Sequence, residues 1–407
     1  MPGCVTYYTS LLPGSFKQYS TPFDSFWCCV GTGMENHSKY AESIYFKDNQ
    51  ELLVNLYIPS RLHWKEKGLK LTLDTYFPES DTVTVRMDEI GSYTGTLLFR
   101  YPDWVSGDAV VRINGEPAQT EAHKGSYIRL LDSVKSGDVI TLVFTRNLYI
   151  DYAKDEPHFG SVMYGPILLA GGLGTDDMPE DRVIDNRACR ESLPAKNIPM
   201  LVGPLTDLDS WIQCSSQHPL RFTVKNGGGQ QGVGLVPYFQ MHHQRHTVYW
   251  KLYSPDEFVY RTRSLTDEVK IGDETDERKH ALQGENDSIY WHDYFWAKNT
   301  RFRMAKDGWF SYTLHINKTE QKPYHLICRF WGDEPDTCQF DILIDGNYLR
   351  TVSLNRKLYL TYVDDVYSIP ADWTRGKDKV NVTFRAAQGK NAGGLYELKI
   401  TSDTNYR

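Results

Sequence analysis

The sequence lacks the features that mark membrane-spanning and nucleic-acid-binding proteins. In its 407 residues no run approaches the ~20 apolar residues that a membrane span requires. The first stretch, MPGCVTYYTS, has neither a basic nor an apolar region, so we expect no secretion signal in this chain. The net charge is −7 with both signs mixed along the chain, which argues against a nucleic-acid partner.

Cysteine is also scarce. The seven cysteines form no CxxC pair and are odd in number, which argues against a disulfide framework. Cys328 and Cys338 flank an expected hairpin, and two interpretations stay open for them: a disulfide in an oxidising compartment, or two buried free thiols.

Aromatic residues are abundant by contrast. The chain has 27 Tyr, 17 Phe and 10 Trp, together 13% of the residues, alongside 31 Gly and 19 Pro. Such a composition is typical of β-sandwiches, where rings fill the core, and of surfaces that bind sugars. We expect most of the rings to be core residues.

One convincing helix is expected, within the first fifty residues. From Gly33 the residues Met34, His37, Ala41, Ile44 and Tyr45 recur at helical spacing, and Thr32 with Glu35 forms a capping-box pattern. The pattern predicts that the helix begins only three residues after Cys29. His37 lies on the apolar stripe of this helix.

Beyond Lys47 the periodicity changes to two, in short alternating runs separated by Gly, Pro, Asp and Asn. TVTVRM, residues 82–87, is one such run, and LIDGNYL, residues 343–349, predicts a two-residue Asp-Gly or Gly-Asn turn. We therefore predict a mainly β fold, with tandem antiparallel β-sandwich or jelly-roll modules after a short helical segment. The expected domains are the helical segment 1–47, a first β-sandwich 48–171, a connector with a second β-module 172–272, and a C-terminal jelly-roll-like sandwich 273–407.

The adjacent residues Cys28 and Cys29 are the main candidates for chemistry. Neighbouring cysteines rarely bond to each other, but they can bind one metal ion, or one can bind a metal while the other acts as a nucleophile. A zinc site needs four ligands, so the pair supplies half of one. Two buried small side chains are the alternative interpretation, and spacing alone leaves both open.

Other candidates have plain structural explanations. Trp27, Glu35 and His37 are candidate sugar contacts, but capping explains Glu35 and a satisfied core position explains His37. In HHQRH, residues 242–246, the strand-like context predicts that His242 and His246 face one way and His243 the other, which disfavours a metal site.

The stretch SFWCCVGTGMENHSKY, preceded by LLPGSFKQYSTP, resembles the cysteine-containing signature of glycoside hydrolase families 127 and 146, the β-L-arabinofuranosidases. The version with VGTGMENH is more similar to family 146. The similarity continues through LLVNLYIPSRLHW, FRYPDW, YGPILLAG and LVPYFQMHHQRHTVYW, and a C-terminal sandwich like that of residues 273–407 is found on these enzymes.

The resemblance implies a retaining glycosidase that removes terminal β-L-arabinofuranosyl residues from plant glycans. By position in the motif, Cys28 matches the nucleophile, whose thiolate is held on Zn²⁺, and Cys29 matches a neighbouring zinc ligand. Family members carry an (α/α)6 barrel with the acid/base residue and a Glu-x-Cys ligand pair, which Cys4 does not match. We therefore expect this chain to be a C-terminal portion with a barrel remnant, an incomplete zinc site and little activity alone.

Two functional hypotheses follow. The first is the glycosidase just described, acting on an arabinose-containing glycan, with a parent protein that is periplasmic or extracellular in a bacterium. The second is a non-catalytic array of carbohydrate-binding or structural β-modules. The sequence sets no oligomeric state, linkage specificity or acid/base residue.

Overall fold

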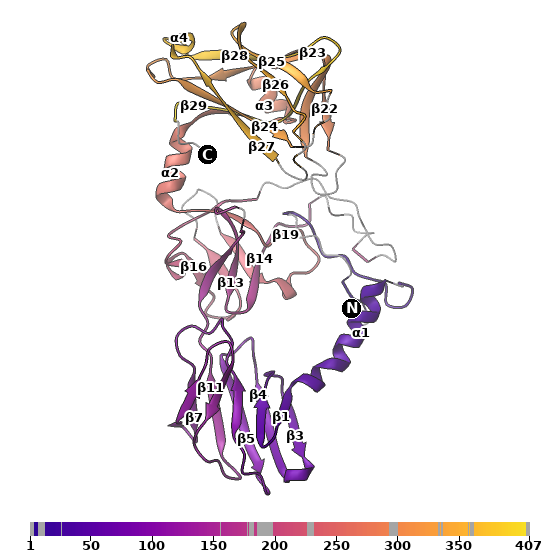
Figure 1. Cartoon of the computed structure of the whole chain (residues 1–407), viewed down its shortest axis with the longest axis vertical. Coiled ribbons are helices and arrows are strands. Elements are labelled where there is room, and N and C mark those ends of the chain that lie inside the picture. Colours follow the sequence, from indigo (N-terminus) through magenta and orange to yellow (C-terminus); the bar gives the residue numbers. More distant parts are fainter. Residues whose placement is uncertain are drawn as a thin grey trace. The chain divides into compact units, whose positions relative to one another are not determined.

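The computed structural model describes residues 4–6, 13–25, 27–154, 156–176, 178, 183–184, 198–225, 232–292, 300–332, 334, 337–356, 358 and 362–403, with backbone alone for 260–264. These residues form two compact units, Met1–Ser254 and Pro255–Arg407, which we describe separately. Strands dominate both, and the longest helix, α1 (Cys28–Lys39), has 12 residues (Figure 1). The predicted mainly β class is confirmed. Within the described residues no helix is long and apolar enough to cross a membrane.

The first unit opens with α1 and continues into a β-sandwich. One of its sheets has the order β1 (Tyr45–Asp48), β2 (Glu51–Val54), β6 (Leu97–Arg100), β10 (Tyr127–Leu130), β9 (Thr120–Ala122). The other has the order β3 (Ser60–Trp64), β4 (Leu69–Thr75), β5 (Thr82–Glu89), β11 (Val139–Val143), β7 (Val110–Ile113), β8 (Glu116–Pro117).

Alternation in the sequence explains how these sheets pack. Along β5 the side chains of Val83, Val85 and Met87 are buried while their neighbours are more exposed. They join one hydrophobic core with Val54 and Phe99 of the other sheet. Because each buried aliphatic side chain stabilises a fold by ~1.5–3 kcal/mol, this shared core holds the two sheets face to face.

A third sheet completes the first unit. Its order is β15 (Leu201–Val202), β20 (Trp250–Tyr253), β13 (Phe159–Tyr164), β14 (Ile167–Gly172), β18 (Val233–Pro237), β17 (Phe222–Val224), β16 (Ile212–Cys214), with β12 (Leu148–Tyr152) on β13 and β19 (His246–Thr247) on β14. The strands near 160–171, which alternation places at the end of the first sandwich, thus pair with strands of the following module. Most of the expected connector lies outside the described residues.

The second unit begins with α2 (Pro255–Ser264) and α3 (Glu274–Lys279), on either side of β21 (Leu265–Val269). Its sheet has the order β26 (Asn347–Ser353), β25 (Gln339–Ile344), β28 (Lys379–Ala386), β23 (Arg301–His315), β29 (Asn391–Thr401), β24 (Tyr324–Trp331), β27 (Tyr362–Ile369). β21 pairs with β29, and β22 (Gln283–Trp291) pairs with β23; the short helix α4 (Ala371–Thr374) precedes β28.

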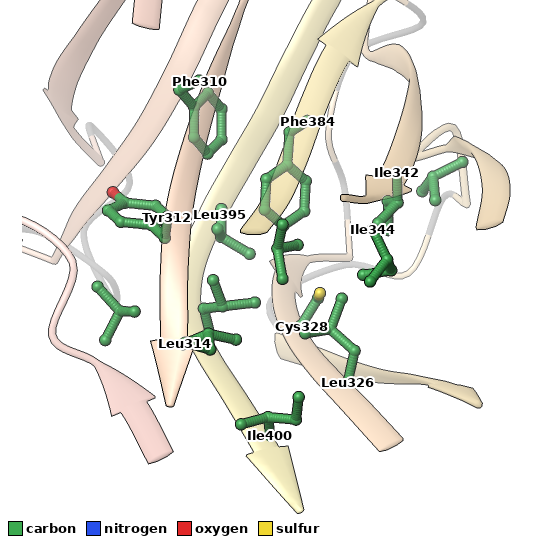
Figure 2. Close-up of a cluster of buried hydrophobic side chains, with 14 of the residues drawn as sticks. Phe310, Tyr312, Leu314, Leu326, Cys328, Ile342, Ile344, Phe384, Leu395 and Ile400 are labelled. Atoms are coloured by element: carbon green, nitrogen blue, oxygen red, sulfur yellow. The ribbon is translucent and has the colours of Figure 1, made fainter. Parts of the chain in front are cut away.

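The core of the second unit is apolar and includes both cysteines of the expected hairpin region. Figure 2 shows Phe310, Tyr312 and Leu314 of β23 among the buried side chains, with Cys328 of β24 near Leu326. Cys328 and Cys338 are buried and free, so the free-thiol interpretation holds. The predicted two-residue turn is also present, with Asp345 at φ 49° and Gly346 at φ 81°, as a tight hairpin turn requires.

Candidate functional site

The paired cysteines lie at the start of α1. Trp27 precedes the helix with an extended backbone, φ −85° and ψ 147°, and its side chain donates or accepts no capping hydrogen bond. Cys28 and Cys29 are therefore the first two helical residues, five positions earlier than the Thr32 and Glu35 pattern predicts. Their thiols lie where a helix presents unpaired backbone N–H groups and a positive dipole end.

The expected capping box is wrong for a physical reason. Thr32 lies inside the helix, and its hydroxyl donates to the carbonyl oxygen of Cys28 at 3.2 Å, one turn back. Glu35 is exposed on the third turn. At an N-cap the threonine oxygen accepts a backbone N–H, whereas inside a helix the hydroxyl donates to the carbonyl of residue i−4. The sequence pattern is compatible with both.

Hydroxyl groups fix the turn that leads into the helix. The backbone N–H of Thr21 donates to Oγ of Ser25 at 2.9 Å, and the N–H of Asp24 donates to Oγ1 of Thr21 at 3.1 Å. Ser25 is buried. The Tyr-Ser-Thr-Pro segment is thus a closed turn that delivers the chain to Trp27 and Cys28.

The segment before this turn is joined to the third sheet. The N–H of Gly14 donates to the carbonyl of His246 at 2.9 Å, and the N–H of His246 donates to the carbonyl of Ser15 at 2.8 Å. The buried Arg245 donates from Nε to the Gly14 carbonyl at 2.6 Å. The PGSFK and HHQRH motifs, both used above for the resemblance, therefore meet in space.

The two thiols differ in exposure. Cys28 is exposed and Cys29 is half-buried. Partial burial raises the pKa of the Cys29 thiol, and the hydrogen bond and charge of the adjacent Cys28 raise it further. One negative charge on this pair therefore opposes a second, so a neighbouring cation is needed for both sulfurs to ionise together.

Helical geometry separates the other candidates from Cys28. Glu35 follows it by seven residues, which places it on the same face of α1 but about 10 Å further along the axis. A retaining glycosidase needs its two groups only ~5 Å apart, so Glu35 is too distant to act as the acid/base partner of Cys28. His37 follows by nine residues and lies on the opposite face.

His37 is not a core residue. The structure exposes it, and its Nδ1 donates to the carbonyl oxygen of Gly33 at 2.8 Å. Its ring also makes an edge contact with Tyr40, with centroids 5.9 Å apart. Trp27 is half-buried at the helix start, next to Cys28. Sugar contacts by Trp27, Glu35 and His37 stay predictions.

The structure supplies half of a metal site at most. Among the described residues no group of three or more His, Cys, Asp or Glu side chains is arranged to hold a metal ion. The histidines of HHQRH do not alternate as expected, because the backbone turns at His243, where φ is 52°. His242 and His243 are exposed while His246 is buried. Two adjacent thiols fit zinc chemistry, but they leave two of its four positions to other ligands.

Helix α1 carries exposed apolar surface. None of its residues is buried, and Met34 is 68% exposed. Ile44, which follows the helical segment, is buried, because the chain enters the first sandwich there and its carbonyl accepts the N–H of Asn55 at 2.8 Å.

Sequence reasoning missed one feature of the first sandwich. A cavity of about 500 Å³ lies where several strands end, lined partly by Arg100 and Trp104 of the FRYPDW motif. That motif contributed to the resemblance, but alternation and spacing give no sign that its Arg and Trp share a cavity.

Comparisons with sequence models of known families match four segments of the chain. Residues 2–42 match the catalytic domain of the GH127 β-L-arabinofuranosidases, and residues 51–146 match the GH127 middle domain. The second match covers nearly the whole first sandwich. Residues 149–252 and 262–401 match families of unknown function. A search of curated proteins found no significant match.

Solved structures give more distant likenesses. A glycoside hydrolase is 19% identical, with a TM-score of 0.46 over 62% of this chain and 45% of that one. A GH127 β-L-arabinofuranosidase from Geobacillus stearothermophilus T6 is 17% identical, with a TM-score of 0.38 over 55% of this chain and 37% of that one. A GH127 β-arabinofuranosidase is 16% identical, with a TM-score of 0.40 over 62% of this chain and 44% of that one. This chain thus spans less than half the length of these structures. The similarity to family 146 stays a prediction.

Proposed function

We propose that this chain carries the cysteine helix and the β-modules of a retaining glycosidase that removes terminal β-L-arabinofuranosyl residues from plant glycans. The observation that carries the proposal is the exposed thiol of Cys28 in the first turn of α1, within a segment that matches the GH127 catalytic domain. The adjoining match to the GH127 middle domain supports the same enzyme class.

In the proposed reaction the Cys28 thiolate attacks the anomeric carbon. The carbon–sulfur bond forms as the glycosidic carbon–oxygen bond breaks, and an acid protonates the departing oxygen. Water, which gives a proton to the conjugate base of that acid, then attacks the same carbon from the face that the leaving oxygen occupied, opposite to sulfur, and the electron pair of the carbon–sulfur bond returns to sulfur. The acid/base group is not assigned here, since helical geometry separates Glu35 from Cys28.

Cys28 and Cys29 are the proposed zinc ligands of this chain. A zinc ion bound there would supply the positive charge that keeps the nucleophilic thiol ionised at neutral pH. The described residues provide two of the four zinc ligands, and we propose that the other two come from polypeptide outside this sequence. We also propose that the parent protein is located in the bacterial periplasm or outside the cell.

The test uses the full reading frame that contains this sequence, assayed on an aryl β-L-arabinofuranoside. Cys28→Ser is expected to lower kcat by roughly 10³-fold or more, because serine is a far weaker nucleophile at neutral pH. Cys29→Ser is expected to lower bound zinc, measured by elemental analysis. Cys214→Ser removes another exposed thiol and is the matched control, with unchanged rate and zinc content. Full activity of Cys28→Ser would overturn the proposal.

A second experiment uses the isolated 407-residue chain. We expect it to release no arabinose and to bind less than one zinc ion per molecule, because its described residues provide two of the four zinc ligands. Turnover by this chain that disappears in Cys28→Ser would show that the site is complete within it.

A non-catalytic β-module array is the competing function. The observation in its favour is that the described residues contain no metal cluster. Glycan binding without turnover by the full reading frame would support the array over the enzyme.

A further inference from the structure

The cavity in the first sandwich lies at the ends of four strands. Tyr57 follows β2, Phe77 follows β4, Arg100 ends β6 and Phe144 follows β11, and all four line it together with Trp104. Its volume of about 500 Å³ falls within the ~300–1,000 Å³ of small-ligand sites. All of its walls come from residues 55–144, so the cavity belongs to this sandwich alone.

The aromatic wall of the cavity is held in place. The Trp104 ring stacks on Phe77, with centroids 5.7 Å apart and planes 28° apart, and meets Phe144 edge-on at 6.3 Å. The guanidinium of Arg146 lies 5.5 Å from the Phe77 ring and is fixed by Asp81 at 2.5 Å. Trp104 and Phe77 are half-buried, so part of each ring remains accessible from the cavity.

Arg100 provides a charge that the protein does not neutralise. Within the described part of the chain its guanidinium makes no hydrogen bond or ion pair, and its side chain is half-buried. It lies 5.6 Å from the centre of the Tyr127 ring. No acidic residue is among the described residues that line the cavity. The Arg100 guanidinium therefore lines the cavity without an acceptor among the described residues.

A chain of hydrogen bonds positions this arginine. The Tyr127 hydroxyl donates to Oδ1 of Asn55 at 2.8 Å, and Nδ2 of Asn55 donates to the carbonyl of Ser43 at 3.1 Å. The ring under Arg100 is thus fixed before any ligand arrives. Such preorganisation reduces the entropy that binding costs.

We propose that this cavity binds a carboxylate-bearing sugar, a hexuronate residue of a polysaccharide. Its carboxylate pairs with the guanidinium of Arg100 in the two-point geometry that arginine favours, and the apolar face of its pyranose ring lies against Trp104. A neutral sugar leaves Arg100 unpaired, and an inorganic anion has no apolar face for the aromatic wall. The inference goes beyond the proposed hydrolysis and is tested without turnover.

The test titrates the 407-residue chain with methyl α-D-galacturonoside and with methyl α-D-galactoside, followed by calorimetry and ligand-detected NMR. We expect the uronoside to bind roughly tenfold more tightly or better, as a charge-assisted hydrogen bond implies. Inorganic phosphate and acetate are expected to bind more weakly than the uronoside. Equal affinity for the two glycosides, tighter binding of phosphate, or no binding of either glycoside would overturn the proposal.

Four variants test where the uronoside binds. Arg100→Gln is expected to remove the preference for the uronoside, and Trp104→Leu to weaken both glycosides. Arg129→Gln is the matched control, because Arg129 lies in the same sheet on β10 but is paired with Glu51 at 2.6 Å and does not line the cavity. Circular dichroism checks that each variant is folded, and Arg100→Lys, which keeps the charge, is expected to retain part of the preference. If folded Arg100→Gln still prefers the uronoside over the galactoside, the uronate binds elsewhere and the proposal is overturned.

Discussion

Arg303 and Glu277 form a two-point ion pair inside the second unit. Nε and Nη2 of Arg303 donate to the two carboxylate oxygens of Glu277 at 3.0 and 2.9 Å, and the Tyr312 hydroxyl donates to Glu277 Oε1 at 2.6 Å. Burial lowers the pKa of Arg303, but the hydrogen bond to Glu277 and the charges of Tyr312, Glu277 and Asp287 together outweigh it, and the net change is upward. The pair joins α3 to β23.

Glu277→Gln is expected to lower the unfolding free energy of the second unit by about 2 kcal/mol, because it removes the carboxylate that pairs with the buried Arg303 at two points and leaves Asp287 as the remaining ionic partner of Arg303. Glu274→Gln on the same helix is the matched control. Its pair with Arg278 is long, 3.8 Å, and exposed, so the expected change is within ~0.5 kcal/mol. Hydrogen exchange of the β23 amides measures both. Equal effects of the two substitutions would contradict this account.

His246 makes the stability of the first unit depend on pH. Burial lowers the pKa of His246 from 6.5 to about 4. The unfolded chain therefore binds this proton at a higher pH than the folded chain does. The contribution is fully present above about pH 6.5 and is lost as the pH falls toward 4, by about 3 kcal/mol at most.

His246→Phe is expected to flatten this part of the pH dependence, since phenylalanine has no proton to bind. Hydrogen exchange of the β14 amides at pH 5 and pH 7, corrected for intrinsic rates, provides the measurement. His243→Gln alters an exposed histidine nearby and should leave the dependence as in the wild type. An unchanged pH slope in His246→Phe would assign the dependence to other groups.

The exposed and the buried cysteines are expected to differ in their rate of alkylation. Burial raises the pKa of the Cys338 thiol to about 12 and raises that of Cys328 well above its ordinary value. At pH 8 the thiolate fraction of Cys338 is then roughly 10⁻⁴. Iodoacetamide should modify the exposed Cys28 and Cys214 in the folded protein, and Cys328 and Cys338 only after unfolding. Peptide mass spectrometry separates the sites, and rapid native labelling of Cys338 would show that the start of β25 opens readily.

Helix α1 is expected to exchange its amide hydrogens quickly in this chain. None of its side chains is buried, so little tertiary packing supports a helix of 12 residues. Hydrogen exchange with mass spectrometry compares peptides from 28–39 with peptides from β5, whose core side chains predict slow exchange. Equal protection of α1 and β5 in a monomer would require a packing partner for the helix.

Local patterns predicted local structure well. Alternation located β5 because Val83, Val85 and Met87 each face one core, and Asp345 and Gly346 were identified as a turn because few residue pairs tolerate two positive φ angles. The start of α1 was misplaced because a threonine three residues before a glutamate is compatible with a cap and with a helix interior. A capping threonine and a threonine inside a helix differ in backbone conformation, which the sequence pattern does not show.

Contacts between residues far apart in the chain could not be predicted from the sequence. Nothing local indicates that Gly14 bonds to His246, or that Arg100 lacks an acidic partner while Trp104 stacks on Phe77. Such facts depend on which strands become neighbours, and two strands that alternate equally well do not specify their partners. For the site, the roles of Cys28 and Cys29 stay predictions of the motif, while their exposure and their helical position came from the structure alone.

The backbone bonds between Gly14, Ser15 and His246 have a consequence for how this polypeptide can be divided. Cys28 is held from both sides: the chain before it pairs with the third sheet, and the chain after α1 runs directly into β1 of the first sandwich. A fragment that stops at residue 146 can keep its sandwich core and still lose the strand that aligns the cysteine segment. The reactive thiol therefore belongs to an arrangement that no single module contains, and cutting at module boundaries separates it from half of its support.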